Sequence, residues 1–128
     1  MKSGNLLTEL ELKVMNVLWN IKKGFVKDIL DNWETDDEDK KPAYNTISTI
    51  VRILKDKKDF VGHEAFGRSH QYFPIISKTE YQKEFLDNAI DNIFAGSFSS
   101  LVSTFVDKKD ISAADLEKLK ALIDEKTK

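Results

Sequence analysis

The most constraining feature of the sequence is a change of hydrophobic period near residue 58. Residues 42–57 carry apolar side chains at the i, i+3, i+4, i+7 spacing of a helix that packs on a core. Pro42 suits the first turn of that helix, because its missing N–H would have no helical partner there. Two short runs with strand character follow, 60–65 and 71–75, and Gly67 can take a positive φ in the turn between them. The core-facing residues of the helix are Ile47, Ile50, Val51 and Leu54.

Two further helices are expected before residue 42. Thr8 and Glu11 fit a capping box, in which each side chain accepts a backbone N–H at the start of a helix, and Gly24 is expected to end that helix. A short second helix follows, and then an acidic stretch at 34–41 that we expect to be a solvated loop. Three helices followed by a hairpin make the layout of a winged helix-turn-helix domain, which we assign to residues 1–75.

Residues 76–128 are expected to form a helical dimerisation domain, so that the fold class is mainly α with one small β-hairpin. Ser77 and Glu80 make a second capping box, Gly96 breaks the pattern, and Ser112 starts a last helix. Each large apolar side chain left in water would forfeit roughly 1.5–3 kcal/mol. Pairing with a second copy would cover them, and packing back on the first domain is the alternative. The residues expected in the dimer interface are Phe85, Ile93, Phe98, Leu101, Val102, Phe105, Leu116 and Leu119.

The polar face of the helix at 42–57 has the side chains that DNA recognition uses. Asn45, Ser48, Thr49 and Arg52 share this face at helical spacing, and such side chains can pair with base edges in a major groove. Residues 40–72 hold seven Lys or Arg against three Asp or Glu, a local +4 in a chain of net charge −2. Arg68, in the hairpin turn, is expected to contact a phosphate or the minor groove. The alternative is a helix face that is merely solvated.

Composition and motif spacing exclude several other classes of function. The 128 residues include no Cys, which rules out disulfides, thiol catalysis and cysteine-based metal sites. No stretch approaches the roughly 20 apolar residues of a membrane span, and no signal peptide is recognisable, so we expect a cytoplasmic protein without membrane insertion. His63, Glu64 and His70 lack the spacing of a metal motif. No catalytic set can be assembled, so we expect no enzyme, no metal and no cofactor.

Three groups of residues together resemble the penicillinase repressor family (BlaI/MecI type). The groups are Leu7-Thr8-Glu9-Leu10-Glu11 with Val14-Met15 and Leu18-Trp19, then Thr46-Ile47-Ser48-Thr49-Ile50, and then Gly67-Arg68 with Tyr72-Phe73-Pro74. The resemblance covers nearly the whole chain and implies a homodimeric transcriptional repressor of a resistance or stress operon, with the third helix in the major groove of a near-palindromic operator. With the polar face above, the residues expected to contact DNA are Lys41, Tyr44, Asn45, Thr46, Ser48, Thr49, Arg52 and Arg68.

The resemblance also implies induction by a membrane-bound sensor protease, which leads to cleavage of the repressor in its dimerisation domain. The family's scissile bond typically lies between Asn and Phe, and the matching candidate here is Thr104-Phe105. Two other positions depart from the family: Ile53 stands where Arg is frequent, with Arg52 one place earlier, and residues 58–59 replace a Gly. The Cys cluster of the copper-sensing branch does not occur in the sequence. A winged-helix protein-interaction module without specific DNA binding is the alternative function.

Overall fold

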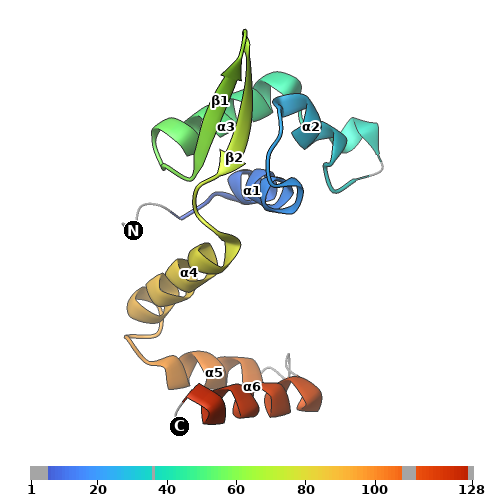
Figure 1. Ribbon diagram of the computed structural model, residues 1–128. Coiled ribbons are helices and arrows are strands. Elements are labelled where there is room, and N and C mark those ends of the chain that lie inside the picture. The colour runs from blue at the N-terminus through green and yellow to red at the C-terminus, as the bar shows by residue number, and fades with distance from the viewer. Residues whose placement is uncertain (1–5, 36, 108–111, 127–128) are drawn as a thin grey trace. The chain divides into compact units, whose positions relative to one another are not determined.

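The computed structural model describes residues 6–35, 37–107 and 112–126. Its helices and strands confirm the predicted mainly α fold with one antiparallel hairpin (Figure 1). In chain order they are α1 (Glu9–Ile21), α2 (Val26–Asp31), the 3₁₀ turn η2 (Glu38–Lys40), α3 (Tyr44–Asp56), β1 (Val61–Phe66), β2 (Ser69–Pro74), α4 (Lys78–Asn92), α5 (Phe98–Asp107) and α6 (Ala113–Lys126). None of the helices in the described part of the chain has the length and apolar character needed to cross a membrane.

Two compact units make up the chain, one ending at Phe85 and the other beginning at Leu86. This division lies inside α4, because Tyr81 in the first turns of the helix is buried against Trp19 and Phe60, with ring centroids 6.1 and 5.8 Å away. The domain boundary expected between residues 75 and 76 stays a prediction, since α4 contributes to both units.

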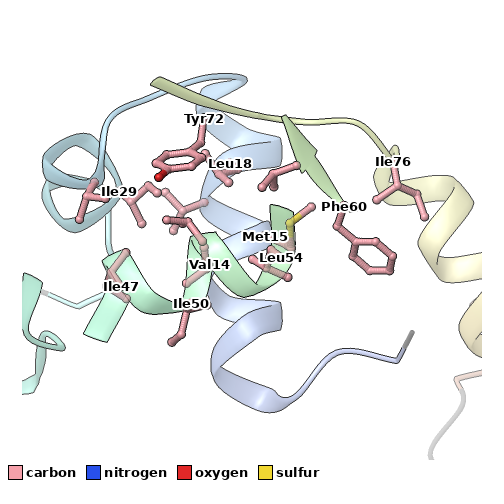
Figure 2. Close-up of a cluster of buried hydrophobic side chains, with 14 of the residues drawn as sticks. Val14, Met15, Leu18, Ile29, Ile47, Ile50, Leu54, Phe60, Tyr72 and Ile76 are labelled. Atoms are coloured by element: carbon pink, nitrogen blue, oxygen red, sulfur yellow. The ribbon is translucent and has the colours of Figure 1, made fainter. Parts of the chain in front are cut away.

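The core of the first unit lies between α1, α2, α3 and the base of the hairpin (Figure 2). The predicted apolar stripe of α3 is confirmed, because all four of its side chains are buried. Phe60, Val61 and Tyr72 add to this core from the hairpin and the residue before it. The side chains with less than 2% exposure are Phe60, Met15, Leu18, Ile29, Ile47, Leu54, Val14, Val51 and Val61.

The start of α1 has the predicted capping box, but its end differs from the prediction. Thr8 Oγ1 accepts the N–H of Glu11 at 3.2 Å, and Glu11 Oε1 accepts the N–H of Thr8 at 2.8 Å. Gly24 does not end the helix, so this prediction is wrong: α1 stops at Ile21, and its C-cap Lys22 has a positive φ of 75°. Gly24 instead pairs its backbone with Tyr72, through N–H···O contacts of 2.9 and 2.8 Å.

Helix α3 starts two residues later than the prediction placed it. Pro42 lies before the helix rather than in its first turn, because Ala43 is still extended (ψ 151°) and serves as the N-cap. Lys41 is extended as well, as the residue before a proline prefers. After the helix, Asp59 takes a positive φ of 57°. Residues 58–59 are the place where the penicillinase repressor family usually has a Gly. Asp tolerates this left-handed conformation better than most residues, which explains how the chain turns into β1 without glycine there.

The hairpin is longer than predicted and its turn is shorter. Strands β1 and β2 pair from Val61↔Pro74 to Phe66↔Ser69, so that Gly67 and Arg68 alone form the connection. Gly67 has φ 63°, as expected for the first position of a type II′ turn. We call this hairpin the wing.

In the second unit, polar caps and left-handed residues separate the helices. Helix α4 ends at Asn92, and Ala95 and Gly96 take positive φ values of 51° and 78° before α5 begins, so the predicted break at Gly96 lies in the connection between the two helices. Ser97 Oγ accepts the N–H of Ser100 at 3.1 Å at the start of α5. Ser112 Oγ caps α6 in the same way at 3.1 Å.

Candidate nucleic-acid interface

The exposed face of α3 is polar along its whole length. It lies opposite the buried apolar stripe, so the packing of the core presents this face to solvent. Asn45, Thr46, Thr49 and Arg52 are exposed, and Ser48 is half-buried. The predicted set therefore shares one accessible surface.

Two of these side chains lie along the helix and bond to its backbone. The hydroxyl of Thr49 donates to the carbonyl oxygen of Asn45 at 2.9 Å, and Arg52 Nε donates to that of Ser48 at 3.3 Å. Arg52 Nη2 also lies 3.5 Å from the hydroxyl oxygen of Ser48. These bonds restrict the rotamers of Thr49 and Arg52, which lowers the entropy lost when a ligand binds them.

A groove of about 610 Å³ runs between α2, α3 and the wing. Four of the eight predicted contact residues line it: Tyr44, Ser48 and Arg52 from α3, and Arg68 from the wing turn. Ile53, where the family often has Arg, is half-buried, so Arg52 supplies the cation of this helix to the groove. Asn45, Thr46 and Thr49 lie on the exposed face but do not line the groove.

The structure adds Lys27 and His70 to the residues that line the groove. Sequence reasoning missed both, because nothing in their local spacing distinguishes them from other surface residues. They meet Arg52 only where α2, β2 and α3 come together. A third cation, from α2, is thus combined with those of α3 and the wing.

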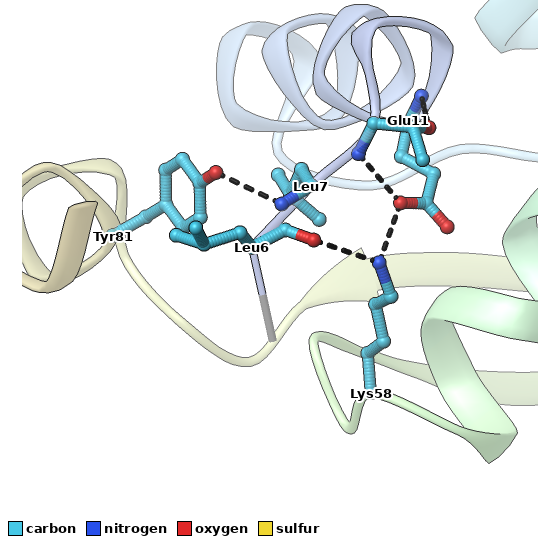
Figure 3. A network of polar contacts seen from close by, with 6 residues as sticks. Leu6, Leu7, Glu11, Lys58 and Tyr81 are labelled. Atoms are coloured by element: carbon cyan, nitrogen blue, oxygen red, sulfur yellow. Dashed lines mark hydrogen bonds and ion pairs between the residues drawn. The ribbon is translucent and has the colours of Figure 1, made fainter. Parts of the chain in front are cut away.

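Not every basic residue between 40 and 72 serves this surface. Lys58 turns inward and pairs with Glu11 at 2.6 Å (Figure 3), and Lys41 pairs with Glu38 at 3.0 Å. Lys41 lines a separate hollow near Pro42 rather than the groove. In the described part of the chain, Arg52 and Arg68 have no carboxylate within the 4 Å of an ion pair, so their charges are available to a ligand.

Two side chains of the wing, Tyr72 and His63, have pKa values shifted from their ordinary values. Burial raises the pKa of Tyr72, against the opposing effect of Arg52, so its phenol stays protonated. Partial desolvation, with the charges of Lys55 and His70, lowers the pKa of His63. The rings of His63 and His70 lie 4.5 Å apart. Among the described residues, no group of three or more His, Cys, Asp or Glu is arranged to hold a metal ion.

Large apolar side chains are exposed between α4 and α6. Phe85, Ile93, Phe98 and Leu116, all predicted interface residues, are exposed in the single chain, and Ile93 reaches 74%. Of the others, Leu101 is buried, Val102 and Leu119 are half-buried, and the side chain of Phe105 lies outside the described residues. Thr104 is exposed in α5, and its hydroxyl donates to the carbonyl oxygen of Ser100 at 2.9 Å.

Comparison with known proteins gives a family match over both units. The model of the family described as penicillinase repressor matches residues 7–125. The methicillin resistance regulatory protein MecI of Staphylococcus aureus strain N315 is 28% identical over 120 residues, which cover 94% of each chain. The proteins of the same description from Staphylococcus epidermidis and Mammaliicoccus sciuri have the same identity and coverage. Because the family model spans nearly the whole chain, the protein belongs to the penicillinase repressor family.

Proposed function

We propose that this protein is a transcriptional repressor that binds a near-palindromic DNA operator as a homodimer. The observation that carries the proposal is the exposed polar face of α3, which lies beside a groove lined by Arg52 and Arg68. A helix of this kind fits a major groove, where Asn pairs with adenine, Ser and Thr with several bases, and the Thr methyl group with thymine. The relatives that regulate methicillin resistance support a resistance operon as its target.

The wing and α2 supply the contacts that do not depend on base sequence. Arg68 in the wing turn and Lys27 on α2 line the same groove as Arg52. Positive side chains in this arrangement neutralise phosphates and release counterions, so binding should weaken steeply with salt. A dimer would present two copies of α3 about 34–36 Å apart, or a multiple of that distance.

The exposed apolar residues of the C-terminal helices support the homodimer. Burying Phe85, Ile93 and Phe98 against a second copy would remove large apolar side chains from water, each worth roughly 1.5–3 kcal/mol. A two-fold axis is the commonest way to close such a surface.

Release by a membrane-bound sensor protease, with cleavage at Thr104-Phe105, is part of the same proposal. The candidate bond lies in α5, whose backbone is hydrogen-bonded. Cleavage there requires local unwinding of α5, because a protease acts on locally opened chain.

The test is footprinting and gel shift of the full chain on the DNA upstream of its own gene. We expect a protected near-palindrome.

Arg68→Ala should weaken binding to all duplexes and reduce the salt slope by about one. Thr49→Ala should change the preference among bases in the half-site. Thr79→Ala, an exposed position at the start of α4, is the matched control and should change neither. Unchanged binding in both test variants would contradict the proposal.

A second candidate is a winged-helix module whose polar face docks a protein. The ion pair between Lys41 and Glu38 favours it, because the acidic stretch there neutralises one of the cations expected on DNA. This candidate predicts no salt-sensitive duplex binding, so the same titration separates the two functions.

A further inference from the structure

The outer half of the wing has few contacts with the rest of the first unit. The base of the wing is fixed to the core, since Val61 and Tyr72 are buried and the backbone of Tyr72 pairs with that of Gly24. Beyond them, residues 63–66 of β1 and 69–70 of β2 are all exposed. A two-stranded hairpin without further packing is only marginally stable in water. The position of the turn therefore depends on any contact that the outer half does make.

One aromatic contact joins this outer half to the helices. The rings of Phe66 and Phe25 lie 5.7 Å apart at 66°, an edge-to-face arrangement that aromatic pairs favour. Among the described residues, the other ring contacts of the outer wing, between His63, His70 and Tyr72, stay within the hairpin.

Phe25 is the fixed member of this pair. It is the N-cap of α2, its N–H donates to Asp28 Oδ2 at 2.9 Å, and its side chain is half-buried. Phe66 is 50% exposed and is the last residue before the turn. A Cβ at Gly67 would meet no atom within 4 Å, so nothing packs against that side of the turn.

We propose that Phe66 is a positioning residue for DNA binding: its ring, packed on Phe25, holds the turn where Arg68 lines the groove with Arg52. The proposal rests on the DNA-binding function above. It explains why a half-exposed phenylalanine lines a cationic groove, a place where a polar side chain would be better solvated. Phe66 acts through Arg68 and needs no contact with DNA of its own.

A double-mutant cycle on the full chain tests this role. Phe66→Ala is made with and without Arg68→Ala, and affinity for the footprinted duplex is measured at several salt concentrations. We expect Phe66→Ala alone to weaken binding about 2- to 10-fold and to lower the salt slope toward that of Arg68→Ala. In the Arg68→Ala background it should have no further effect. Phe66→Tyr, which keeps the ring, should bind like the wild type.

Phe73→Ala is the matched control, because Phe73 is also a part-exposed ring of the wing (39%) but covers Gly62 rather than Phe25. It should leave the salt slope unchanged. Additive losses from Phe66→Ala and Arg68→Ala would overturn the proposal, since the ring would then contact DNA itself or act only on folding. The proposal would also be overturned if Phe73→Ala lowered the salt slope as much as Phe66→Ala does.

Amide hydrogen exchange on the free protein is a second test, and it needs no DNA. Phe25→Ala should accelerate exchange at Ser69, which pairs with Phe66 at the end of the ladder, and leave Val61 and Tyr72 unchanged. Unchanged exchange at the turn would overturn the role of the ring pair even if the protein binds DNA. Accelerated exchange in a protein that binds no duplex would instead refute only the DNA-binding function.

Discussion

At the scale of single residues, the least expected finding is the position of Lys58. Lys58 is one of the seven cations that the sequence places between residues 40 and 72. In the structure its side chain is mostly buried, and its Nζ donates to Glu11 Oε1 at 2.6 Å and to the carbonyl oxygen of Leu6 at 2.9 Å (Figure 3). Next to it, the hydroxyl of Tyr81 accepts the N–H of Leu7 at 3.0 Å. Lys58 and Tyr81 thus hold the residues before α1, and Lys58 contributes to the fold rather than to the positive surface.

This ion pair predicts a specific pH dependence of stability. Burial raises the pKa of Glu11, but the hydrogen bond and charge of Lys58 and the bonds from Thr8 outweigh it, so the folded-state pKa lies below 4.5. The pair therefore stabilises the fold fully above about pH 4.5, and this contribution is lost as pH falls through the lower folded-state pKa. Urea unfolding of Glu11→Gln between pH 7 and 3 should show a shallower decline than the wild type.

Glu9→Gln is the control for that series, because Glu9 is exposed and lies 3.8 Å from Lys13 on the surface of α1. Its pH profile should match that of the wild type. Parallel profiles for Glu11→Gln and the wild type would show that the buried pair contributes nothing in acid.

At the scale of elements, the fold of the first unit depends on how the α1–α2 connection meets the wing. Gly24 lies where a side chain has no room: a Cβ there would be 2.8 Å from Ile21 Cδ1 and 2.9 Å from Asp28 Cβ. The close approach lets the backbone of Gly24 pair with Tyr72 and continue the sheet by one bridge. One side of the groove depends on this connection, because α2 follows it directly.

Gly24→Ala should therefore destabilise the first unit by about 1–3 kcal/mol, the usual cost of forcing extra atoms into packed structure. The midpoint of urea unfolding measures it. Lys23→Ala, at the exposed neighbouring position, is the matched control and should change the midpoint little. An alanine variant as stable as the wild type would mean that Ile21 and Asp28 move aside without cost.

At the scale of the whole chain, several large apolar side chains are exposed between α4 and α6. The large apolar side chains exposed there include Leu86, Ile93 and Phe98. Surfaces of this kind mark association sites in soluble proteins. The proposed operator contact needs two recognition helices, so dimerisation and DNA affinity should be lost together.

Ile93→Glu tests that coupling, because Ile93 is the most exposed of these side chains. A charge in a buried interface is costly, so sedimentation should show a shift toward monomer and operator affinity should fall at least tenfold. Gln82→Glu adds the same charge at an exposed polar position and should remain dimeric. A dimeric Ile93→Glu protein would place the interface elsewhere.

Local features were predictable from sequence because they depend on neighbours a few residues apart. The capping boxes at Thr8 and Ser77, the buried stripe of α3 and the glycine of the wing turn all formed as predicted. The ends of helices were harder to predict: Lys22 rather than Gly24 takes the positive φ, and Pro42 precedes the N-cap. Gly24 instead pairs with Tyr72 of the wing, a long-range contact that no local pattern encodes.

The helices, the hairpin and the polar face of α3 could be predicted from the sequence, because helical period, caps and turn glycines act over three or four residues. Three-dimensional packing was needed to show which cations share the groove, that Lys58 pairs with Glu11, and that Phe66 meets Phe25. Those contacts join residues far apart in the sequence, such as Glu11 and Lys58 with a separation of 47. No local pattern encodes them, since they exist only once the core has brought α1, α2, α3 and the wing together.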